Sequence, residues 1–514
     1  MHKTLPAAIS LAVTAVCSPG WEAATSQTQN RLLFPQDDYI VETMTVRTSG
    51  GERDVTYRSY MHIPYVAHPV DSDFQSLNVS VPIQVDGVAI DATNVPMLLN
   101  ITVGGYMSVN NAASGAGARP LRGAPDRGPG AGAGGPPRGG PGGNSNLSSR
   151  QDLALAAGYV VVTPGVRGRD NQAADGTYYG KAPAAIVDLK AAVRYVRNND
   201  AVMPGNADWI VSAGCSAGGA LSALLGASGN SPLYDRYLEE IGAADVADDV
   251  YASACYSPIT DLEHSDMSYE WMYGTTPARS GLVDQELSRQ LQESYAEYQK
   301  TLDLAGENGF GPITADNYGE YVLRYYLIPS ANEYLNGLTA EARYEYLATN
   351  AWIKWSGNGA AFAFKDYVAH VGRMKGLPAF DDLAMRQPEP ILFGNETTHA
   401  RHFTDFSLRQ ATGNPNAAIE DELKTVVNMM NAMYFLRQNS SDIAGHWWLR
   451  SGTSDNHTSQ TVMVNLATSL ENRGKEVNAW LFWDGGHCAD ADPEGLIAWI
   501  GNVTGFAQGS GSGN

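Results

Sequence analysis

The sequence predicts a protein of the α/β class, with a mostly parallel central sheet and a large helical insertion. Strand patterns alternate with helix patterns from about residue 150 to residue 260, and again after residue 446. Such alternation implies right-handed crossovers and parallel strands. One apolar strand runs directly into a glycine-flanked serine and then into a helix of small residues. Residues 263–440 have few strand-like runs and are rich in Tyr, Leu, Glu and Ala at helical spacing.

Composition excludes some classes of partner. The chain has 514 residues, 43% of them hydrophobic, which is enough for a sizeable core in one large domain with insertions or in several domains. Its formal net charge of −21 argues against nucleic acid or an anionic membrane surface as a partner. The sequence predicts no oligomeric state.

The first 24 residues have the pattern of an export signal. His2 and Lys3 precede an apolar run, Leu5–Cys17, which small residues follow. The run is too short to span a bilayer, and no later segment is apolar enough to do so. The alternative is a buried first strand. We expect a secreted or periplasmic protein without membrane insertion.

The first part of the core is expected at residues 30–262. Four alternating runs indicate an antiparallel start to the sheet: Tyr39–Val46, Val55–Ile63, Leu77–Val85 and Met97–Val103. The last run leads into Gly104-Gly105-Tyr106. Backbone N–H groups of Gly105 or Tyr106 could face a neighbouring cleft and form half of an oxyanion hole, or the glycines could simply make a turn.

A Gly/Pro-rich insert at residues 112–144 interrupts this core and is expected to be disordered, as a neutral surface insertion or as a flank of the site entrance. Regular structure resumes in this order: a helix at 152–157, a strand at 159–163, a helix at 182–198 and a strand at 250–255. A helical cap is expected at 263–440 and the second part of the core at 441–508. That second part holds strands at 446–450 and 477–482 and a helix at 459–472, and residues 509–514 form a flexible tail.

The sequence Gly214-Cys215-Ser216-Ala217-Gly218 has the pattern of a nucleophile elbow, in which a tight strand-to-helix turn raises the serine hydroxyl above the sheet. The glycines leave room for the strained backbone of Ser216. Ala217 then begins the helix, and its N–H would be the second oxyanion donor. The alternative is an ordinary strand–turn–helix connection.

A serine nucleophile needs a base and an acid that orients the base. Two loops that follow predicted strands near the C-terminus supply Asp455 and His487. The chain order Ser216, Asp455, His487 is the order of an α/β-hydrolase triad. Asp484 is the rival acid, although it lies close to His487 in the sequence. Neither a metal nor a cofactor is expected.

Two cysteines lie beside these candidates, since Cys215 precedes Ser216 and Cys488 follows His487. If the serine and histidine are hydrogen-bonded, the cysteine Cα atoms come within the roughly 4.4–6.8 Å that a disulfide requires, and export would permit the bond. The alternative is two unrelated buried thiols. Cys255 is expected to be a buried thiol within a strand.

The arrangement Cys215-Ser216, Asp455, His487-Cys488 resembles the CS-D-HC pattern of the tannase and feruloyl esterase group of α/β-hydrolases. The resemblance is closer to bacterial-type tannases and runs from about residue 40 to residue 505, apart from the insert. Four stretches carry it: 180–190 (GKAPAAIVDLK), 216–222 (SAGGALS), 258–264 (PITDLEH) and 392–396 (LFGNE).

The resemblance implies a cap that binds a galloyl ring through a lysine and a glutamate, with an acidic residue after the catalytic aspartate. By motif position these are Lys375 and Glu389, or else ordinary surface charges. The acidic position is occupied by His457, which can hydrogen-bond a phenol but is not a permanent anion.

These features predict a serine esterase that hydrolyses phenolic acid esters, with galloyl esters first, through an acyl-enzyme. A feruloyl esterase and a general carboxylesterase are the close alternatives. A serine peptidase and a non-catalytic module of hydrolase fold are further ones.

Overall fold

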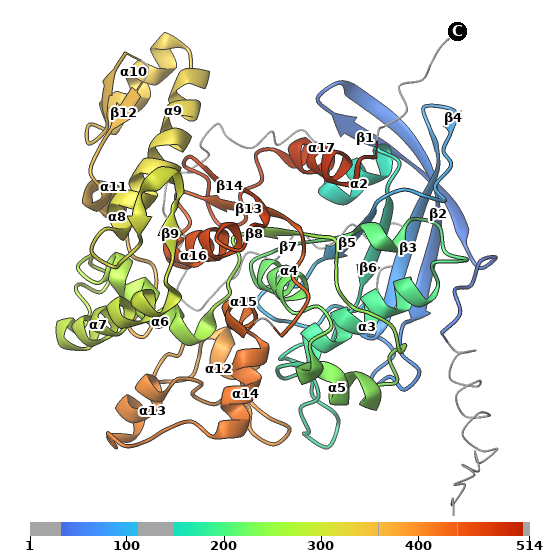
Figure 1. Cartoon of the computed structure of the whole chain (residues 1–514), viewed down its shortest axis with the longest axis horizontal. Coiled ribbons are helices and arrows are strands. Elements are labelled where there is room, and N and C mark those ends of the chain that lie inside the picture. The colour runs from blue at the N-terminus through green and yellow to red at the C-terminus, as the bar shows by residue number, and fades with distance from the viewer. Residues whose placement is uncertain (1–31, 112–147, 358, 439, 507–514) are drawn as a thin grey trace, which may run out of the picture.

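The computed structural model describes residues 32–111, 148–357, 359–438 and 440–506, and its centre is a sheet that counts ten strands within these ranges (Figure 1). The expected export signal, the whole of the Gly/Pro-rich insert and the tail lie outside the described residues. The strand order is β1-β2-β3-β6-β5-β7-β8-β13-β14, with β4 paired to β3. The strands are β1 (Ile40–Thr48), β2 (Gly51–Pro64), β3 (Ser76–Val85), β4 (Val88–Ala89), β5 (Met97–Ile101), β6 (Val160–Pro164), β7 (Ile210–Cys215), β8 (Ala252–Tyr256), β13 (His446–Gly452) and β14 (Glu476–Phe482).

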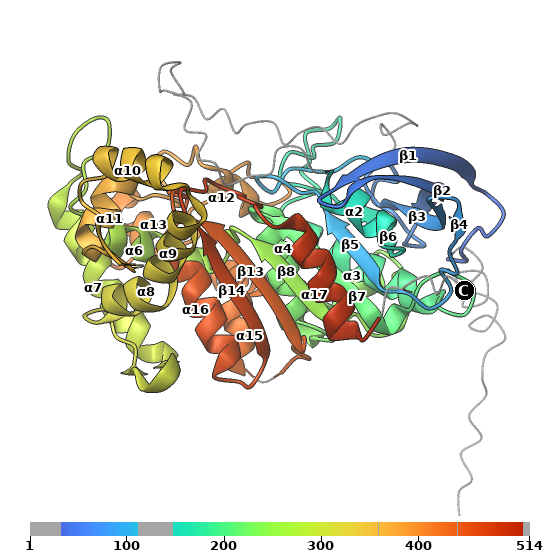
Figure 2. The same cartoon turned by 90° about the horizontal axis from the view of Figure 1, so that it is seen from above.

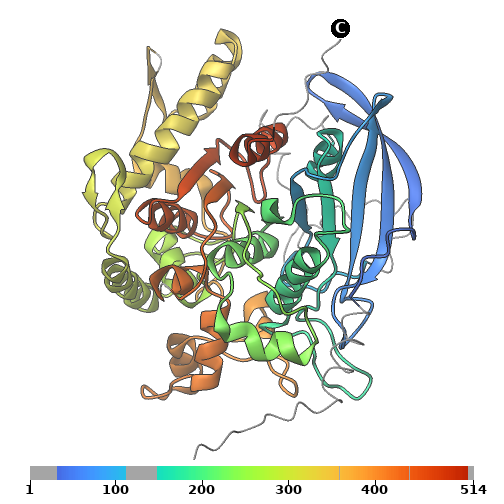
Figure 3. The same cartoon turned by 45° about the vertical axis from the view of Figure 1, so that its right-hand side comes forward.

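Strand pairing in the sheet changes once along this order, from antiparallel to parallel. Strands β1 to β3 are antiparallel, and β3 also pairs antiparallel with β6. From β6 to β14 every pair is parallel. The antiparallel strands stand at one edge of the molecule, on the side opposite the helices drawn in yellow (Figure 3). The predicted α/β-hydrolase architecture, with a mostly parallel sheet, is confirmed.

The fourth predicted strand has a different neighbour from the one expected. Residues Met97–Ile101 form β5, which ends two residues early and lies parallel between β6 and β7 rather than in the antiparallel start. Its sequence, MLLNI, is almost wholly apolar, and four of its five residues are buried. Such a run is typical of an interior parallel strand, covered on both faces.

Successive residues of the central strands pack on opposite faces of the sheet, because side chains alternate along a strand. In β6, Val160 and Val162 pack on one face, with α3 and α4. Val161 packs on the other, with α2 and α17. The helices of these two layers are α2 (Arg150–Ala156), α3 (Ala184–Asn198), α4 (Ala217–Ala227), α5 (Asp235–Glu240), α16 (Gln460–Glu471) and α17 (Pro493–Thr504).

Residues after β8 form the helical insertion, whose first part lies at the far side of the sheet from β1 (Figures 1 and 2). It also holds two small two-stranded sheets, β9 (Ala305–Gly306) with β10 (Gly311–Pro312), and β11 (Lys354–Ser356) with β12 (Gly359–Ala361). Its helices are α6 (Leu262–Tyr273), α7 (Gln285–Leu302), α8 (Tyr318–Val322), α9 (Ile328–Gly337), α10 (Ala340–Thr349), α11 (Phe364–Val371), α12 (Pro388–Leu392), α13 (Asp405–Thr412), α14 (Asp421–Met429) and α15 (Ala432–Gln438). The last of them, α15, packs against α4 and α16, so the insertion ends within the layer that covers the sheet.

Candidate active site

Ser216 sits in the tight turn between β7 and α4. Its φ of 59° and ψ of −122° are strained for a serine. Its N–H donates to the carbonyl of Tyr256 at 2.9 Å. A Cβ at Gly214 would collide with the carbonyl of Gly218, and a Cβ at Gly218 would lie 2.9 Å from the carbonyl of Val103. Both flanking positions therefore require glycine.

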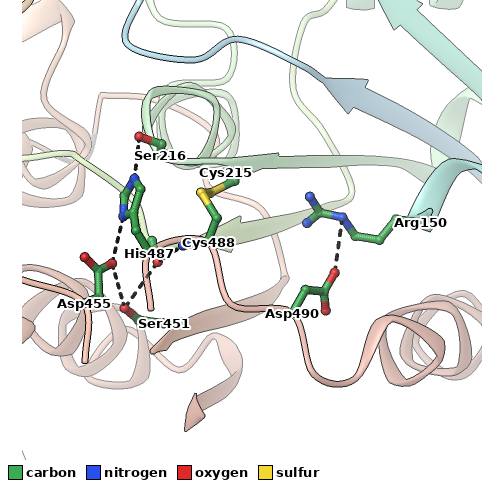
Figure 4. Close-up of a disulfide and its surroundings, with 9 residues drawn as sticks. Arg150, Cys215, Ser216, Ser451, Asp455, His487, Cys488 and Asp490 are labelled. Atoms are coloured by element: carbon green, nitrogen blue, oxygen red, sulfur yellow. Dashed lines mark hydrogen bonds and ion pairs between the residues drawn. A yellow bond between two sulfur atoms is a disulfide. The ribbon is translucent and has the colours of Figure 1, made fainter. Parts of the chain in front are cut away.

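His487 and Asp455 reach Ser216 from the loops that follow β14 and β13 (Figure 4). The His487 Nε2 atom is 2.9 Å from Ser216 Oγ, and its Nδ1 atom is 2.9 Å from Asp455 Oδ2. Asp484 lies elsewhere, because its carboxylate accepts from Tyr346 Oη at 2.7 Å and lies 3.6 Å from His370 Nε2. The structure thus brings together the three residues expected, and not the rival acid.

The Asp455 carboxylate is buried, which opposes its ionisation, yet its pKa lies below the usual value. The hydrogen bond and charge of His487 outweigh the burial, helped by the charge of His457 and the N–H of that residue, which donates to Asp455 Oδ1 at 3.0 Å. Ser451 Oγ lies 3.4 Å from the other oxygen. An ionised Asp455 can hold the imidazole in one tautomer and stabilise its charged form.

A disulfide joins the serine turn to the histidine loop. Cys215 and Cys488 are bonded, with their Cα atoms 5.7 Å apart, beside the Ser216–His487 pair (Figure 4). Cys255 is a buried thiol in β8. The metal-binding atoms of Cys215, His487 and Cys488 lie within 4.8 Å of one another. Because both sulfurs are bonded to each other in the disulfide, they are not available as thiolate ligands.

Two further residues position the loops, and sequence reasoning missed both. A Cβ at Gly452 would collide with the carbonyls of Gly485 and Gly486, so the loops that carry Asp455 and His487 touch at a point where only glycine fits. Ser257 Oγ accepts from the N–H of Cys488 at 3.0 Å. The glycine at the end of β13 was the available signal for the close approach.

The expected oxyanion donors lie on either side of Ser216. Ala217 is the first residue of α4, where an N–H has no partner within the helix. Gly105 and Tyr106 form a turn after β5, next to the elbow, because the N–H of Gly218 donates to the carbonyl of Val103 at 3.0 Å. Within the described residues, the N–H groups of Ala217, Gly105 and Tyr106 make no hydrogen bond. They can therefore serve a bound oxygen.

The three residues expected to bind the ring lie at different positions relative to the triad. The His457 ring stacks on His487, with ring centres 4.1 Å apart and planes 8° apart. Glu389 is buried in α12. The pKa of Tyr106 is raised first by the burial of the tyrosine and then by the charge of Glu389. The Lys375 ammonium lies 3.5 Å from the centre of the Phe380 ring. Of the three, His457 contacts the triad, and Glu389 acts electrostatically on the Tyr106 side chain.

Tyr269 connects the Lys375 segment to the site, and sequence reasoning did not identify it. Its hydroxyl accepts from the N–H of Lys375 at 3.0 Å and donates to the carbonyl of Asn456 at 3.1 Å. Asn456 lies between Asp455 and His457 in the chain. The loop that carries Lys375 is therefore bound to the loop that carries Asp455.

A cavity of about 440 Å³ lies elsewhere, between the β1–β2 turn, α2 and α17. None of the site residues lines it, and its charged groups are Arg53 and Glu494. We therefore place the candidate active site at Ser216, because the hydrogen-bonded serine, histidine and aspartate lie there and none of them lines this cavity.

The chain is similar over most of its length to solved tannase structures. The Fusobacterium nucleatum tannase is 34% identical with a TM-score of 0.76, and the match covers 92% of this chain and 99% of that one. The tannin acyl hydrolase of Lactobacillus plantarum is 33% identical, with a TM-score of 0.76 and the same coverage. A tannin acyl hydrolase in complex with ethyl gallate is 32% identical, with a TM-score of 0.76 and again 92% and 99% coverage.

Three further matches cover shorter parts of the chain, and two of them are to esterases. A family model described as BD-FAE matches residues 143–300. Esterase LipC of Mycobacterium tuberculosis is 34% identical over 104 residues, which are 20% of this chain and 22% of that one. Esterase LipQ of the same organism is 40% identical over 90 residues, which are 18% and 20% of the two chains. The chain thus spans about a fifth of the length of these two curated relatives.

Proposed function

The chain belongs to the tannase family of carboxylic ester hydrolases, and on that premise we propose that it hydrolyses phenolic acid esters through Ser216, His487 and Asp455. The observation that carries the proposal is the continuous set of hydrogen bonds from Ser216 Oγ through His487 to the buried carboxylate of Asp455. This is the arrangement that acyl transfer by a serine requires.

In the proposed mechanism, Ser216 Oγ attacks the ester carbonyl while His487 Nε2 takes its proton. The carbonyl oxygen becomes an oxyanion, which the N–H groups of Ala217 and of Gly105 or Tyr106 stabilise. Collapse of this intermediate breaks the ester bond, and the imidazolium returns the proton to the leaving alcohol. Water, activated by the same histidine, then hydrolyses the acyl-enzyme.

We propose a phenolic ring as the acyl group, with Lys375, Glu389 and His457 as its contacts. Support comes from the similarity to the tannin acyl hydrolase with ethyl gallate and from the position of His457 against His487. A cap made of residues 263–440, over a core of residues 30–262 and 441–508, would carry the first two of these contacts. A small-molecule ester is the expected partner.

His457 also favours a second candidate, a general carboxylesterase. A histidine is not a permanent anion, so it offers a phenol a weaker acceptor than a carboxylate does. Galloyl preference would be reduced, while the triad would still cleave feruloyl or simple esters.

We propose that the protein works outside the cytoplasm, secreted or periplasmic. The Cys215–Cys488 disulfide supports this, because such bonds persist in oxidising compartments. Across the part of the chain that the structure describes, no helix has the length and apolarity to cross a bilayer.

The test is kcat/KM for methyl gallate, methyl ferulate and p-nitrophenyl acetate. Ser216→Ala removes the nucleophile, and Ser294→Ala, on the exposed face of α7, is the matched control. We expect a gallate preference of tenfold or more, or about 1.4 kcal/mol of transition-state binding. Activity on all three esters that survives Ser216→Ala would refute the mechanism. Fastest cleavage of the acetate would favour the general carboxylesterase.

A further inference from the structure

The turn that follows β5 has an unusual backbone. The N–H of Met107 donates to the carbonyl of Gly104 at 3.0 Å, and the two residues between them have left-handed φ values of 55° at Gly105 and 57° at Tyr106. Glycine adopts this conformation freely, whereas it costs a residue such as tyrosine about 1–2 kcal/mol. Contacts outside the turn must therefore hold it.

Arg169 holds the turn from one side. Its side-chain Nε donates to the carbonyl of Gly105 at 2.7 Å, and its backbone N–H donates to the carbonyl of Tyr106 at 2.9 Å. Lys181 Nζ in turn donates to the carbonyl of Arg169 at 2.8 Å. Arg169 thus binds both carbonyls of the strained pair.

The Tyr106 side chain holds the turn from the other side. Its buried hydroxyl donates to the carbonyl of Ile259 at 2.8 Å. The N–H of Ile259 donates to the carbonyl of Ser216 at 3.2 Å. The turn is therefore tied to the serine elbow through one intervening residue.

Strand order gives the turn its direction. Because β5 lies between β6 and β7, Arg169, which follows β6, and Ser216, which follows β7, flank the turn on opposite sides. In a trans peptide the C=O and the N–H point in opposite directions. The carbonyl of Gly105 points to Arg169, so the N–H of Tyr106 points to the side of Ser216.

We propose that Arg169 is a positioning residue for the oxyanion hole, and that Tyr106 rather than Gly105 provides the N–H. Without the Arg169 side chain the carbonyl of Gly105 loses its hydrogen bond, so the Gly105–Tyr106 peptide can rotate and turn that oxygen toward the developing negative charge. The inference rests on the proposed ester hydrolysis by Ser216. It assigns no contact between Arg169 and substrate.

The test is Arg169→Met, which keeps the length of the side chain and removes the donor. Arg409→Met is the matched control, because Arg409 Nε donates to a loop carbonyl, that of Ala417, at 2.8 Å in the cap. The loss of one oxyanion donor costs about 10²–10³ in kcat. We expect Arg169→Met to lower kcat by roughly 10–100-fold, since a mobile peptide still samples the productive orientation.

Two comparisons separate positioning from other roles. The oxyanion is common to all esters, so kcat should fall by the same factor for methyl gallate and p-nitrophenyl acetate. An arylboronic acid, whose serine adduct is tetrahedral, should lose affinity by a similar factor, whereas gallate as a product inhibitor should bind unchanged. Arg169→Lys, which keeps a charge and a donor, should recover part of both losses.

Three results would overturn the proposal: unchanged kcat, a loss confined to methyl gallate, or equal weakening of the boronic acid and gallate. The second would make Arg169 a ring contact, and the third would make it a structural residue. Failure of the proposed function looks different, because the wild-type protein and Arg409→Met would then hydrolyse none of the esters.

Discussion

Removal of the Cys215–Cys488 disulfide should lower stability much more than activity. The bond joins residues 273 positions apart, and the chain-entropy model gives about 5.6 kcal/mol for a loop of that length at 25 °C. Measured losses for native disulfides are about 2–5 kcal/mol, so we expect about 4–5 kcal/mol for the variant Cys215→Ala/Cys488→Ala. With an unfolding entropy near 1 kcal/mol per kelvin for 514 residues, Tm should fall by about 4–5 °C.

Activity at 25 °C should survive, because hydrogen bonds still hold the histidine loop. The N–H of Ser454 donates to the carbonyl of Gly485 at 2.8 Å, and Ser257 accepts from the N–H of residue 488 at 3.0 Å. We expect kcat to fall by less than tenfold, or under about 1.4 kcal/mol in activation free energy.

The assay compares thermal unfolding and kcat for three samples: the oxidised protein, the same protein under reductant, and the double variant. Cys255→Ala is the control for loss of a buried sulfur without loss of a cross-link. Reduced protein and double variant should agree. An unchanged Tm would refute the argument that the disulfide stabilises the protein by constraining the unfolded chain. A hundredfold fall in kcat in folded protein would show that the disulfide itself sets the distance between Ser216 Oγ and His487 Nε2.

Three other perturbations test the site and the cap. Gly452→Ala should abolish activity while leaving a folded protein by circular dichroism, since its Cβ would push apart the loops of the acid and the base; activity near that of the wild type would contradict the close approach. His457→Asp should raise the ratio of kcat/KM for methyl gallate to that for p-nitrophenyl acetate by about tenfold, through a permanent acceptor for the ring hydroxyls, and an unchanged ratio would remove this position from the ring site. Burial, followed by the charge of Asp381, raises the pKa of Asp266 to about 7, well above the value near 4 of an unfolded chain. This group therefore stabilises the fold fully below pH 4 and loses that contribution as the pH rises through 7, so the urea midpoint should fall between pH 5 and pH 8. The midpoint should fall less in Asp266→Asn, because that side chain stays neutral. Equal falls in the two proteins would assign the pH dependence to other groups.

The elbow was the easiest feature to predict, because its cause is local. An apolar strand, two glycines and a serine determine the turn within a few residues, and the φ of 59° at Ser216 follows from that sequence. The candidates Asp455 and His487 could also be found, since each follows a strand pattern in the expected order. Here the sequence was sufficient because each signal lay within one segment.

Pairing between distant segments was harder to predict. The neighbours of β5 are set by residues more than 50 positions away, so its run of apolar residues was assigned to the antiparallel start. Its lack of alternation was the usable signal for an interior parallel strand. Helix α17 was also missed, although Asp492, which caps it, and Pro493, at its first position, are ordinary start signals.

Contacts that position the site could not be read from the sequence. Gly452 looks like any glycine after a strand until the loop of Gly485 is seen against it. Arg169 stands 64 residues from the carbonyl that its side chain binds. In both cases the information lies in how two separate loops meet.

The order of the strands also has a consequence for synthesis. The elbow on β7 is complete by residue 227, whereas β13 and β14 join the sheet beside β8 only after the long insertion has been made. A growing chain therefore carries its nucleophile for more than half of its translation without the proposed base at position 487. Cys215 likewise emerges well before Cys488, so until then the other cysteines made are Cys17 and Cys255, neither of which is its partner. The insertion thus delays both the assembly of the proposed triad and the Cys215–Cys488 cross-link until the chain is nearly finished.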